Sequence, residues 1–345
     1  MFVVAYIESE RSVSMDKNVR RIINKALNGG ELTTGELKQL LIVDCLSEEA
    51  YMLQYASRKV SAAASGSRAE VHAQVGINAG PCPKNCQFCS FAQSNKVFSK
   101  EKKFSLEEII EKSLRFEADG ANAIYLMGTA NYKHGDFLAV ARDVRAVLKP
   151  ETPMVANVDD FDEEEAIAMK KAGLAGVYHV VRIGEGSVTG IDPKVRLRTI
   201  AAAQKAGLLV GTCVEPVGPE HSAEEIISII MLVKALKPVY SGVGRRVDIP
   251  GSPLKAHGAL NLARNTSIIA AVKLAMGYKV AGHAGGPSEL AAMAGVNLSW
   301  AEAGSNPRDT QANTVIGGTV ASRRQAFEEA GWEMVDGPSV MFNSR

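Results

Sequence analysis

Residues 70–89 read EVHAQVGINAGPCPKNCQFC, a short apolar, β-branched segment that runs directly into a cysteine-rich turn. The first half is typical of a strand, and Gly80 with Pro81 favours a turn after it. Three of the five cysteines in the chain follow within eight positions, namely Cys82, Cys86 and Cys89. The pattern predicts a strand over residues 71–78 with a cysteine loop at its carboxyl end.

Strand-like and helix-like segments alternate from this point to the end of the chain. Apolar runs predict further strands at residues 123–127, 153–158, 176–181, 208–214, 239–247, 279–282 and 296–299. Helical patterns lie at residues 105–118, 135–148, 162–172, 193–206, 222–236, 260–276, 289–294 and 322–330. Gly120, Gly173, Gly207 and Gly277 each follow a helix, where a left-handed residue often ends it. This order predicts an α/β fold, a (β/α)8 barrel of the TIM type, rather than an open doubly wound sheet.

The residues before the barrel carry helix signals only. Residues 18–27 are amphipathic, Thr33 precedes Glu36 in the spacing of a capping box, and Ser47 opens a third helical segment. We therefore expect residues 1–69 to form a helical extension and residues 70–345 to form the barrel.

Composition excludes several classes of protein. The 345 residues include 39 Lys and Arg against 38 Asp and Glu, and 46% are apolar, which argues against disorder and against a polycationic nucleic-acid binder. No apolar run approaches about 18 residues, and the first residues lack the pattern of a signal peptide. We expect a cytoplasmic protein with neither nucleic acid nor membrane as a partner. Five cysteines are also too few for a disulfide framework.

Three closely spaced thiolates can surround one metal centre but cannot complete four-fold coordination. Structural zinc sites close with four ligands, and the next histidine, His134, lies 45 residues beyond Cys89 (134 − 89). A [4Fe–4S] cluster also normally takes four cysteines, so three leave one iron open. A structural metal or redox-sensing cysteines are the alternatives.

The Cys-x3-Cys-x2-Cys spacing, with the aromatic Phe88 before the third cysteine, resembles the signature of the radical S-adenosylmethionine (SAM) superfamily. The resemblance implies a [4Fe–4S] cluster on Cys82, Cys86 and Cys89, with SAM on the open iron. It also implies reductive cleavage of SAM to a 5′-deoxyadenosyl radical that takes hydrogen from a small-molecule substrate. An electron donor of the flavodoxin or ferredoxin type would be a partner.

From about Glu70 to Gly304 the chain is similar to the biotin synthase-like branch of this superfamily. That branch includes biotin synthase, the [FeFe]-hydrogenase maturase, methylornithine synthase and the radical protein of [Fe]-hydrogenase cofactor assembly. The resemblance implies two sets of SAM contacts, a backbone set at Met127, Gly128, Thr129 and Ala130 and a charged pair at Glu185 and Arg196. Charges at a strand end are equally compatible with salt bridges at the rim.

The differences from biotin synthase narrow the range of reactions that the resemblance implies. Its second, sulfur-donating cluster would need ligands at positions that read Leu126, Val155, Gly211 and Ala281 here, and Cys213 lies two residues beyond one of them. The resemblance therefore favours carbon-skeleton rearrangement or construction of a metal-cofactor ligand. Sulfur insertion with an unusual auxiliary cluster is the alternative within the branch, and a non-catalytic Fe–S carrier is the alternative of another class.

Ionisable residues near predicted strand ends are the candidates for substrate chemistry. We expect catalytic roles for Cys213, Glu215 and His283, with Cys213 and His283 forming a paired site. We expect substrate binding by Tyr178, His179, Arg182, Arg245, Arg246 and Asp248.

Overall fold

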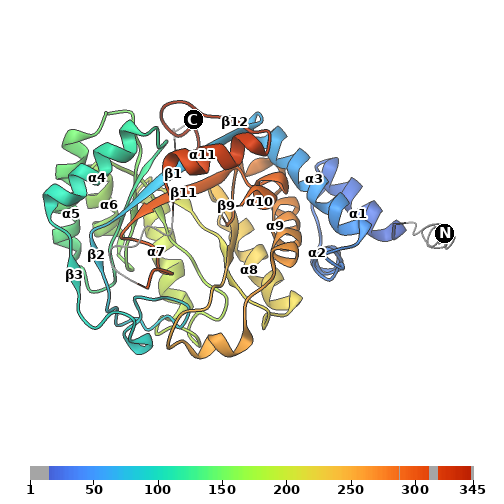
Figure 1. Ribbon diagram of the computed structural model, residues 1–345, viewed down its shortest axis with the longest axis horizontal. Coiled ribbons are helices and arrows are strands. Elements are labelled where there is room, and N and C mark those ends of the chain that lie inside the picture. Colours follow the sequence, from blue (N-terminus) through green and yellow to red (C-terminus); the bar gives the residue numbers. More distant parts are fainter. Residues whose placement is uncertain (1–14, 287, 311–317, 343–345) are drawn as a thin grey trace, which may run out of the picture.

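The computed structural model describes residues 15–286, 288–310 and 318–342, and these form a closed parallel barrel (Figure 1). Pairing between β9 and β10 closes the sheet, and every pairing between neighbouring barrel strands is parallel. The (β/α)8 prediction is confirmed. The barrel strands are β1 (Arg68–Gly76), β4 (Ile124–Met127), β5 (Met154–Asn157), β6 (Leu174–Tyr178), β7 (Leu209–Gly211), β9 (Tyr240–Arg245), β10 (Gly282–Ala284) and β11 (Leu298–Ala303).

Helices lie around the barrel in the order that the sequence predicts. Capping boxes fix the first turn of α4, α6 and α8, because a serine or aspartate pairs with a glutamate three residues on. The helices are α4 (Leu106–Ala118), α5 (His134–Val147), α6 (Glu163–Lys171), α7 (Pro193–Lys205), α8 (Ala223–Ala235), α9 (Leu262–Met276), α10 (Glu289–Met293) and α11 (Val320–Glu329). The short elements are β2 (Asn78–Ala79), β3 (Lys102–Lys103), β8 (Val214–Val217), β12 (Glu333–Met334) and the 3-10 turns η1 (Gln93–Asn95), η2 (Pro253–His257) and η3 (Gly277–Lys279).

Three helices precede the barrel, α1 (Lys17–Leu27), α2 (Thr34–Leu41) and α3 (Glu48–Ser65). The predicted capping box of Thr33 and Glu36 is present. These helices pack on one side of the barrel against α8 and α9, and their apolar residues join the main core (Figure 1). In the described ranges, no helix is long and apolar enough to cross a membrane.

Strand boundaries differ from prediction in the second half of the barrel. The predicted strand at 208–214 is split into β7 and β8, and β10 begins at Gly282 because η3 occupies residues 277–279. The last strand, β11, continues to Ala303 instead of ending at residue 299. His283 and Glu302, which lie outside the predicted strands, are therefore strand residues.

Side chains on β1 alternate between the two faces of the sheet. Val71, Ala73 and Val75 join the apolar layer under the helices, whereas His72 contacts the rings of Tyr125, Trp300 and Phe342 inside the barrel. Glu70 and the segment around Ser339 close the amino-terminal end of the barrel, here called the floor. The cysteine loop follows β1 and β2 at the carboxyl end, here called the mouth.

Candidate active site at the barrel mouth

The cysteine loop is held in shape by its own backbone. The N–H of Cys82 donates to the carbonyl of Phe91 at 2.6 Å, and the N–H of Gln93 donates to the carbonyl of Cys82 at 3.0 Å. The N–H of Cys89 donates to the carbonyl of Cys86 at 2.9 Å. The three cysteines therefore belong to one compact turn rather than to an extended linker.

Neighbouring loops fix this turn over the barrel interior. Ser90 donates its N–H to the carbonyl of Pro307, 2.7 Å away in the segment after β11. On the other side, the N–H of Gln87 donates to the carbonyl of Val188 at 2.9 Å, in the segment after β6. The turn is thus held between the carboxyl ends of β6 and β11.

The thiols of the loop are partly shielded from water. Burial raises the pKa of Cys86 although the charge of Arg182 acts to lower it, and burial together with Cys86 raises the pKa of Cys89 to about 12. Within the described ranges, no three His, Cys, Asp or Glu side chains converge on the position of a single ion. An iron–sulfur cluster does not require such convergence, because a polynuclear cluster offers separate irons to its cysteines.

A charged cluster lies beside Cys86. Arg182, Glu185 and Arg196 all act on the pKa of that thiol. Nε of Arg196 lies 3.9 Å and Nη1 of Arg182 lies 4.0 Å from Oε2 of Glu185, and the Glu185 side chain is only 1% exposed. Nε of Arg182 and Nε of Arg196 are buried without a hydrogen-bond partner in the described residues. The predicted pair Glu185 and Arg196 therefore meets next to the cysteine loop.

His179 and Asp160 support this cluster from beneath. Nη1 of Arg196 lies 3.2 Å from Oδ1 of Asp160, which also lies 3.0 Å from Nε2 of His179. Burial acts to raise the pKa of Asp160, but the hydrogen bond from His179 and the charge of Arg196 outweigh it and lower the pKa. Burial also lowers the pKa of His179. The structure thus places His179 behind Arg196, where it positions the guanidinium.

The segment Met127–Ala130 lies at the end of β4, as predicted, but the N–H groups of Gly128 and Thr129 are already engaged. The N–H of Gly128 donates to the carbonyl of Asn157 at 3.0 Å, and the N–H of Thr129 donates to Oδ1 of Asn78 at 2.8 Å. A Cβ at Gly128 would lie 3.1 Å from the side chain of Ile77, so the glycine is required by packing. The carbonyls of Met127 and Thr129 also accept hydrogen bonds, from the N–H groups of Ile77 and Tyr132, both at 2.9 Å, so the carbonyls of Gly128 and Ala130 are the ones left for a ligand among the contacts described.

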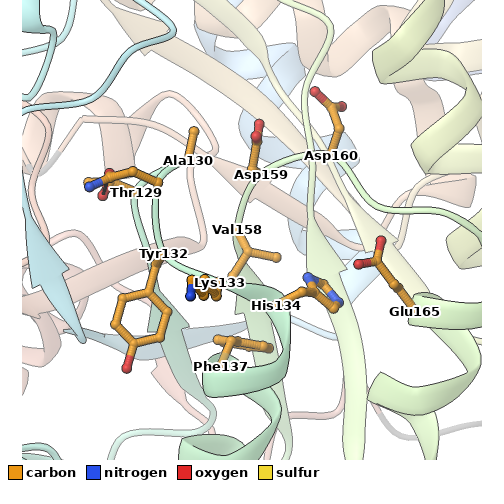
Figure 2. A pocket seen from close by; sticks show the side chains of 11 residues that line it. Thr129, Ala130, Tyr132, Lys133, His134, Phe137, Val158, Asp159, Asp160 and Glu165 are labelled. Carbon is orange, nitrogen blue, oxygen red and sulfur yellow. Dashed lines mark hydrogen bonds between the residues drawn. The ribbon is translucent and has the colours of Figure 1, made fainter.

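A cavity of about 270 Å³ borders the same segment (Figure 2). One wall is the loop after β4 with the start of α5, and the other is the segment after β5 (Figure 2). Its lining residues are Thr129, Ala130, Asn131, Tyr132, Lys133, His134, Phe137, Val158, Asp159, Asp160 and Glu165. The cavity adjoins the charged cluster through Asp160, and no cysteine is among its lining residues.

Inside the barrel, Tyr178, Cys213 and Glu215 form one group. Burial raises the pKa of Tyr178 well above its usual range, as do Cys213 and Glu215 beside it. Burial also raises the pKa of the Cys213 thiol, and the Glu215 carboxylate adds to this effect. Oε1 of Glu215 lies 3.7 Å from Nε of Arg182, which connects this group to the charged cluster. Phe88 completes the connection, because the Arg182 guanidinium lies 5.5 Å from the centre of its ring.

The predicted pairing of Cys213 with His283 is wrong. Cys213 packs in the interior cluster with Ala284, the residue after His283. Because alternate residues of a strand face opposite sides, His283 points outward, and its Nε2 lies 3.0 Å from the carbonyl of Ile269 in α9. Burial lowers its pKa to about 3, so it is an uncharged residue of the core.

The structure assigns Arg245 and Arg246 to loop contacts rather than to the interior. Arg246 forms a two-pronged pair with Glu220, with Nε to Oε1 and Nη2 to Oε2 both at 2.9 Å, and its side chain is 1% exposed. Arg245 donates to the carbonyl of Leu260 at 2.8 Å. Asp248 lies 3.5 Å from Arg246 and is largely exposed. Substrate binding by Arg246 is therefore not supported, because Glu220 occupies its donors.

Several polar residues in the barrel interior near the mouth were not predicted from the sequence as site residues. Nδ2 of Asn157 donates to Oε1 of Gln74 at 2.8 Å, and Nε2 of Gln74 donates to Oε1 of Glu302 at 3.4 Å. Asn306 donates to the other oxygen of Glu302. The signal was present in the sequence, because a strand that includes Leu298 and Trp300 on its inner face places Glu302 there too.

The residues present fit an open iron–sulfur cluster with SAM. Three thiols of one turn supply the donor set, and a nearby metal would deprotonate them despite their raised pKa values. Two buried guanidinium Nε atoms beside Cys86 lack an acceptor, which suits a carboxylate-bearing ligand. The carbonyls after β4 suit an ammonium group.

Comparison with known sequences agrees with this site. Residues 80–233 match the sequence profile of the radical SAM superfamily. The matched region, 154 of the 345 residues, is similar to this superfamily, and its curated relatives lie in the biotin synthase-like branch; the cofactors of the superfamily are a [4Fe–4S] cluster and SAM.

The chain is similar to biotin synthase from Xanthomonas axonopodis pv. citri, at 26% identity over 216 residues. That match covers 60% of this chain and 62% of the biotin synthase, less than two thirds of its length. In fold, the chain is similar to HydG, a maturase of the [FeFe]-hydrogenase, with a TM-score of 0.78, 16% identity and coverage of 94% of this chain and 77% of that one. The methylornithine synthase PylB gives a TM-score of 0.76 at 17% identity, covering 93% and 98%.

Proposed function

We propose that this chain is an enzyme that reductively cleaves SAM and uses the resulting radical to take hydrogen from a small molecule in cofactor or amino-acid biosynthesis. The observation that carries the proposal is the position of the cysteine turn at the barrel mouth, with Arg182, Glu185 and Arg196 beside Cys86. When bound, the reduced cluster supplies the electron that splits SAM into methionine and a 5′-deoxyadenosyl radical.

The chain's own residues hold the reactants in place and exclude water. Cys82, Cys86 and Cys89 would hold the cluster, with one coordination position left for SAM. Arg196, supported by Asp160 and His179, would pair with the SAM carboxylate, while carbonyl oxygens of the segment after β4 would accept from its ammonium. The substrate would lie deeper, among the interior polar residues, with Tyr178, Cys213 and Glu215 near the reacting carbon.

Rearrangement or construction of a metal-cofactor ligand is the chemistry we favour. Among the described interior residues, Cys213 is not accompanied by further cysteines that would form an auxiliary cluster. A protein electron donor of the flavodoxin or ferredoxin type would deliver the electron. Sulfur insertion is the second candidate, because biotin synthases are among the curated relatives with sequence similarity.

The test begins with protein purified and reconstituted without air. Iron analysis should give about four atoms per chain, and clearly more would favour sulfur insertion with an auxiliary cluster. Addition of SAM and dithionite should then produce 5′-deoxyadenosine and methionine, measured by mass spectrometry. An intact cluster that produces neither compound would contradict the proposal and favour a non-catalytic carrier.

A further inference from the structure

The inner face of β11 carries an acidic group to the barrel mouth. Leu298 and Trp300 pack inside the barrel, and Glu302 is the next residue on the same face. It lies at the carboxyl end of the strand, where active sites of such barrels are built. Its side chain is therefore directed into the space beneath the cysteine turn.

Neutral amides fix the orientation of this carboxylate. Gln74 on β1 donates to one oxygen at 3.4 Å and is itself held by Asn157 on β5, while Asn306 donates to the other oxygen. Ser305 ties the following loop to the carbonyl of Gln74 at 3.1 Å. These contacts position Glu302 without neutralising it.

Glu302 has no cationic partner of its own. Across residues 15–286, 288–310 and 318–342, no Lys, Arg or His lies within 4 Å of its oxygens. Burial raises the pKa of Glu302 to about 7, although the more distant charge of Arg308 lowers it. The residue nevertheless keeps some accessible surface. A buried carboxylate of this kind is costly unless a ligand compensates its charge.

Arg308 supplies the opposite charge nearby. It follows Pro307, whose carbonyl accepts the N–H of Ser90 beside the cysteine turn. Its N–H donates to Oδ1 of Asn306 at 2.9 Å, the residue whose amide also donates to Glu302, and its charge acts to lower the pKa of both Glu302 and Cys213. In the part of the chain that the structure describes, no carboxylate lies within 4 Å of its guanidinium.

We propose that Glu302 and Arg308 bind the ammonium and the carboxylate of an amino-acid-like substrate, with Gln74, Asn157 and Asn306 fixing the carboxylate of Glu302. This inference rests on the proposed function, because it names the substrate class of the same site. A purely anionic ligand would be repelled by Glu302 and Glu215, and a purely cationic one by Arg182 and Arg308. A zwitterion compensates both, since an ammonium donates to a carboxylate and a guanidinium fork matches a carboxylate.

The experiment uses reconstituted holoenzyme with SAM and no reductant, so that binding is measured without turnover. The probes are the proteinogenic L-amino acids and ornithine, each beside its N-acetyl and carboxamide derivatives, followed by calorimetric titration. At least one amino acid should bind, and both derivatives should bind about ten-fold or more weakly. After reduction, the same amino acid should raise 5′-deoxyadenosine formation above the rate without substrate.

Two variants test the residues directly. Glu302→Gln and Arg308→Met should each weaken binding of that amino acid by about 10-fold to 100-fold, and Arg308→Met should bind the acid and the carboxamide alike. The exposed Glu111→Gln is the matched control and should bind as the wild type does. The absorbance of the cluster and SAM cleavage without substrate verify that each variant is folded and loaded.

The inference is overturned if no amino acid in the panel binds, if the derivatives bind as tightly as the parent compound, or if both variants bind within two-fold of the wild type. Its failure is separable from that of the proposed function. A wild-type protein that cleaves SAM yet ignores amino acids contradicts only the substrate class. A protein that binds amino acids but cleaves no SAM contradicts only the proposed function.

Discussion

At the floor of the barrel, Glu70 accepts from Val340 at 2.9 Å and from Ser339, and its Oε2 lies 2.8 Å from Nε2 of His72. The network continues from Nδ1 of His72 to the hydroxyl of Tyr125 at 3.1 Å. At the mouth, by contrast, Nε of Arg182 and Nε of Arg196 are buried without a hydrogen-bond partner, and Glu302 has no cation within 4 Å, in the described residues.

The difference shows where ligands belong. Both regions bury charged groups inside the same sheet, but the floor groups have protein hydrogen-bond partners, whereas the mouth leaves two guanidinium Nε atoms without a hydrogen bond and Glu302 without an adjacent cation in the described residues. Buried polar groups are normally paired, because an unpaired one costs about 1–3 kcal/mol. The polar groups of the floor therefore stabilise the folded chain by themselves, whereas those of the mouth stabilise it further only when a ligand binds to them.

The largest expected effect is at the cysteine turn. Cys86→Ala should lower the iron content from about four atoms to less than about one per chain. SAM cleavage should fall by roughly three orders of magnitude or more, because the reactive cofactor is lost. Iron analysis and mass spectrometry of 5′-deoxyadenosine measure both. Cys45→Ala, in the loop between α2 and α3, is the control and should keep both values; equal losses in the two variants would contradict a role specific to the turn.

A substitution at the floor should lower the free energy of unfolding rather than SAM cleavage. Glu70→Ala leaves His72, the Ser339 hydroxyl and the Val340 N–H without their acceptor, which should cost about 2–4 kcal/mol of unfolding free energy. Urea unfolding measures this cost, and SAM cleavage per folded molecule should be unchanged. The exposed Glu333→Ala, also near the floor, should change stability by less than about 0.5 kcal/mol. A floor variant that lost SAM cleavage but not stability would overturn the division of roles.

The charged cluster should give an intermediate effect on ligand affinity. Arg196→Met removes the guanidinium that faces Glu185 and should weaken SAM binding by about 10-fold to 100-fold, or 1.4–2.8 kcal/mol. Equilibrium dialysis of SAM with oxidised holoenzyme measures this change. Thr199→Val is the matched control, because Thr199 also donates to Asp160, at 3.0 Å, from the same helix. If it weakens SAM binding equally, Arg196 acts only through the packing around Asp160.

The sequence was sufficient for features that depend on local pattern. The alternation of strands and helices predicted the barrel, and the spacing of Cys82, Cys86 and Cys89 predicted the turn at its mouth. The resemblance implied a pair of Glu185 and Arg196, and these two side chains do meet, with Arg182 beside them. Each of these depends on residues close together in the chain.

Features that depend on strand register were not predictable. One predicted strand ended at residue 282, so the side of the sheet on which His283 lies was not predicted. Another ended at residue 299, so Glu302 was not recognised as a strand residue. Side chains alternate between the two faces only within a strand, so small errors in the predicted strand ends decide which residues are assigned to the interior. The partner of Arg246, Glu220, comes from a different loop, and its proximity depends on tertiary packing.

The smallest expected effect is on the free energy of unfolding, which should be lower because Glu302 is buried without an adjacent cation in the described residues. Its pKa is about 7 in the folded protein against an ordinary value of 4.5, so the folded state binds more protons than the unfolded state between these pH values. Stability should therefore fall as the pH rises through this window, whereas Glu302→Gln should not show that fall. By pH 8 without SAM or substrate, the variant should gain about 1–2 kcal/mol relative to the wild type, a discounted fraction of the full linkage energy.

Urea unfolding at several pH values between 5 and 8 measures this gain. The charged groups that face Glu302 are Arg308, Asp309 and Arg323, and all three are retained in the variant. Glu36→Gln is the control, because Lys25 and the Thr33 N–H lower the pKa of Glu36 to about 2, which makes its contribution constant over this range. A gain that stays the same from pH 5 to pH 8 would mean that Glu302 is already compensated inside the protein. In that case Glu302 would be satisfied by protein groups, as Glu70 is at the floor. Its carboxylate would then carry no uncompensated negative charge for a substrate ammonium.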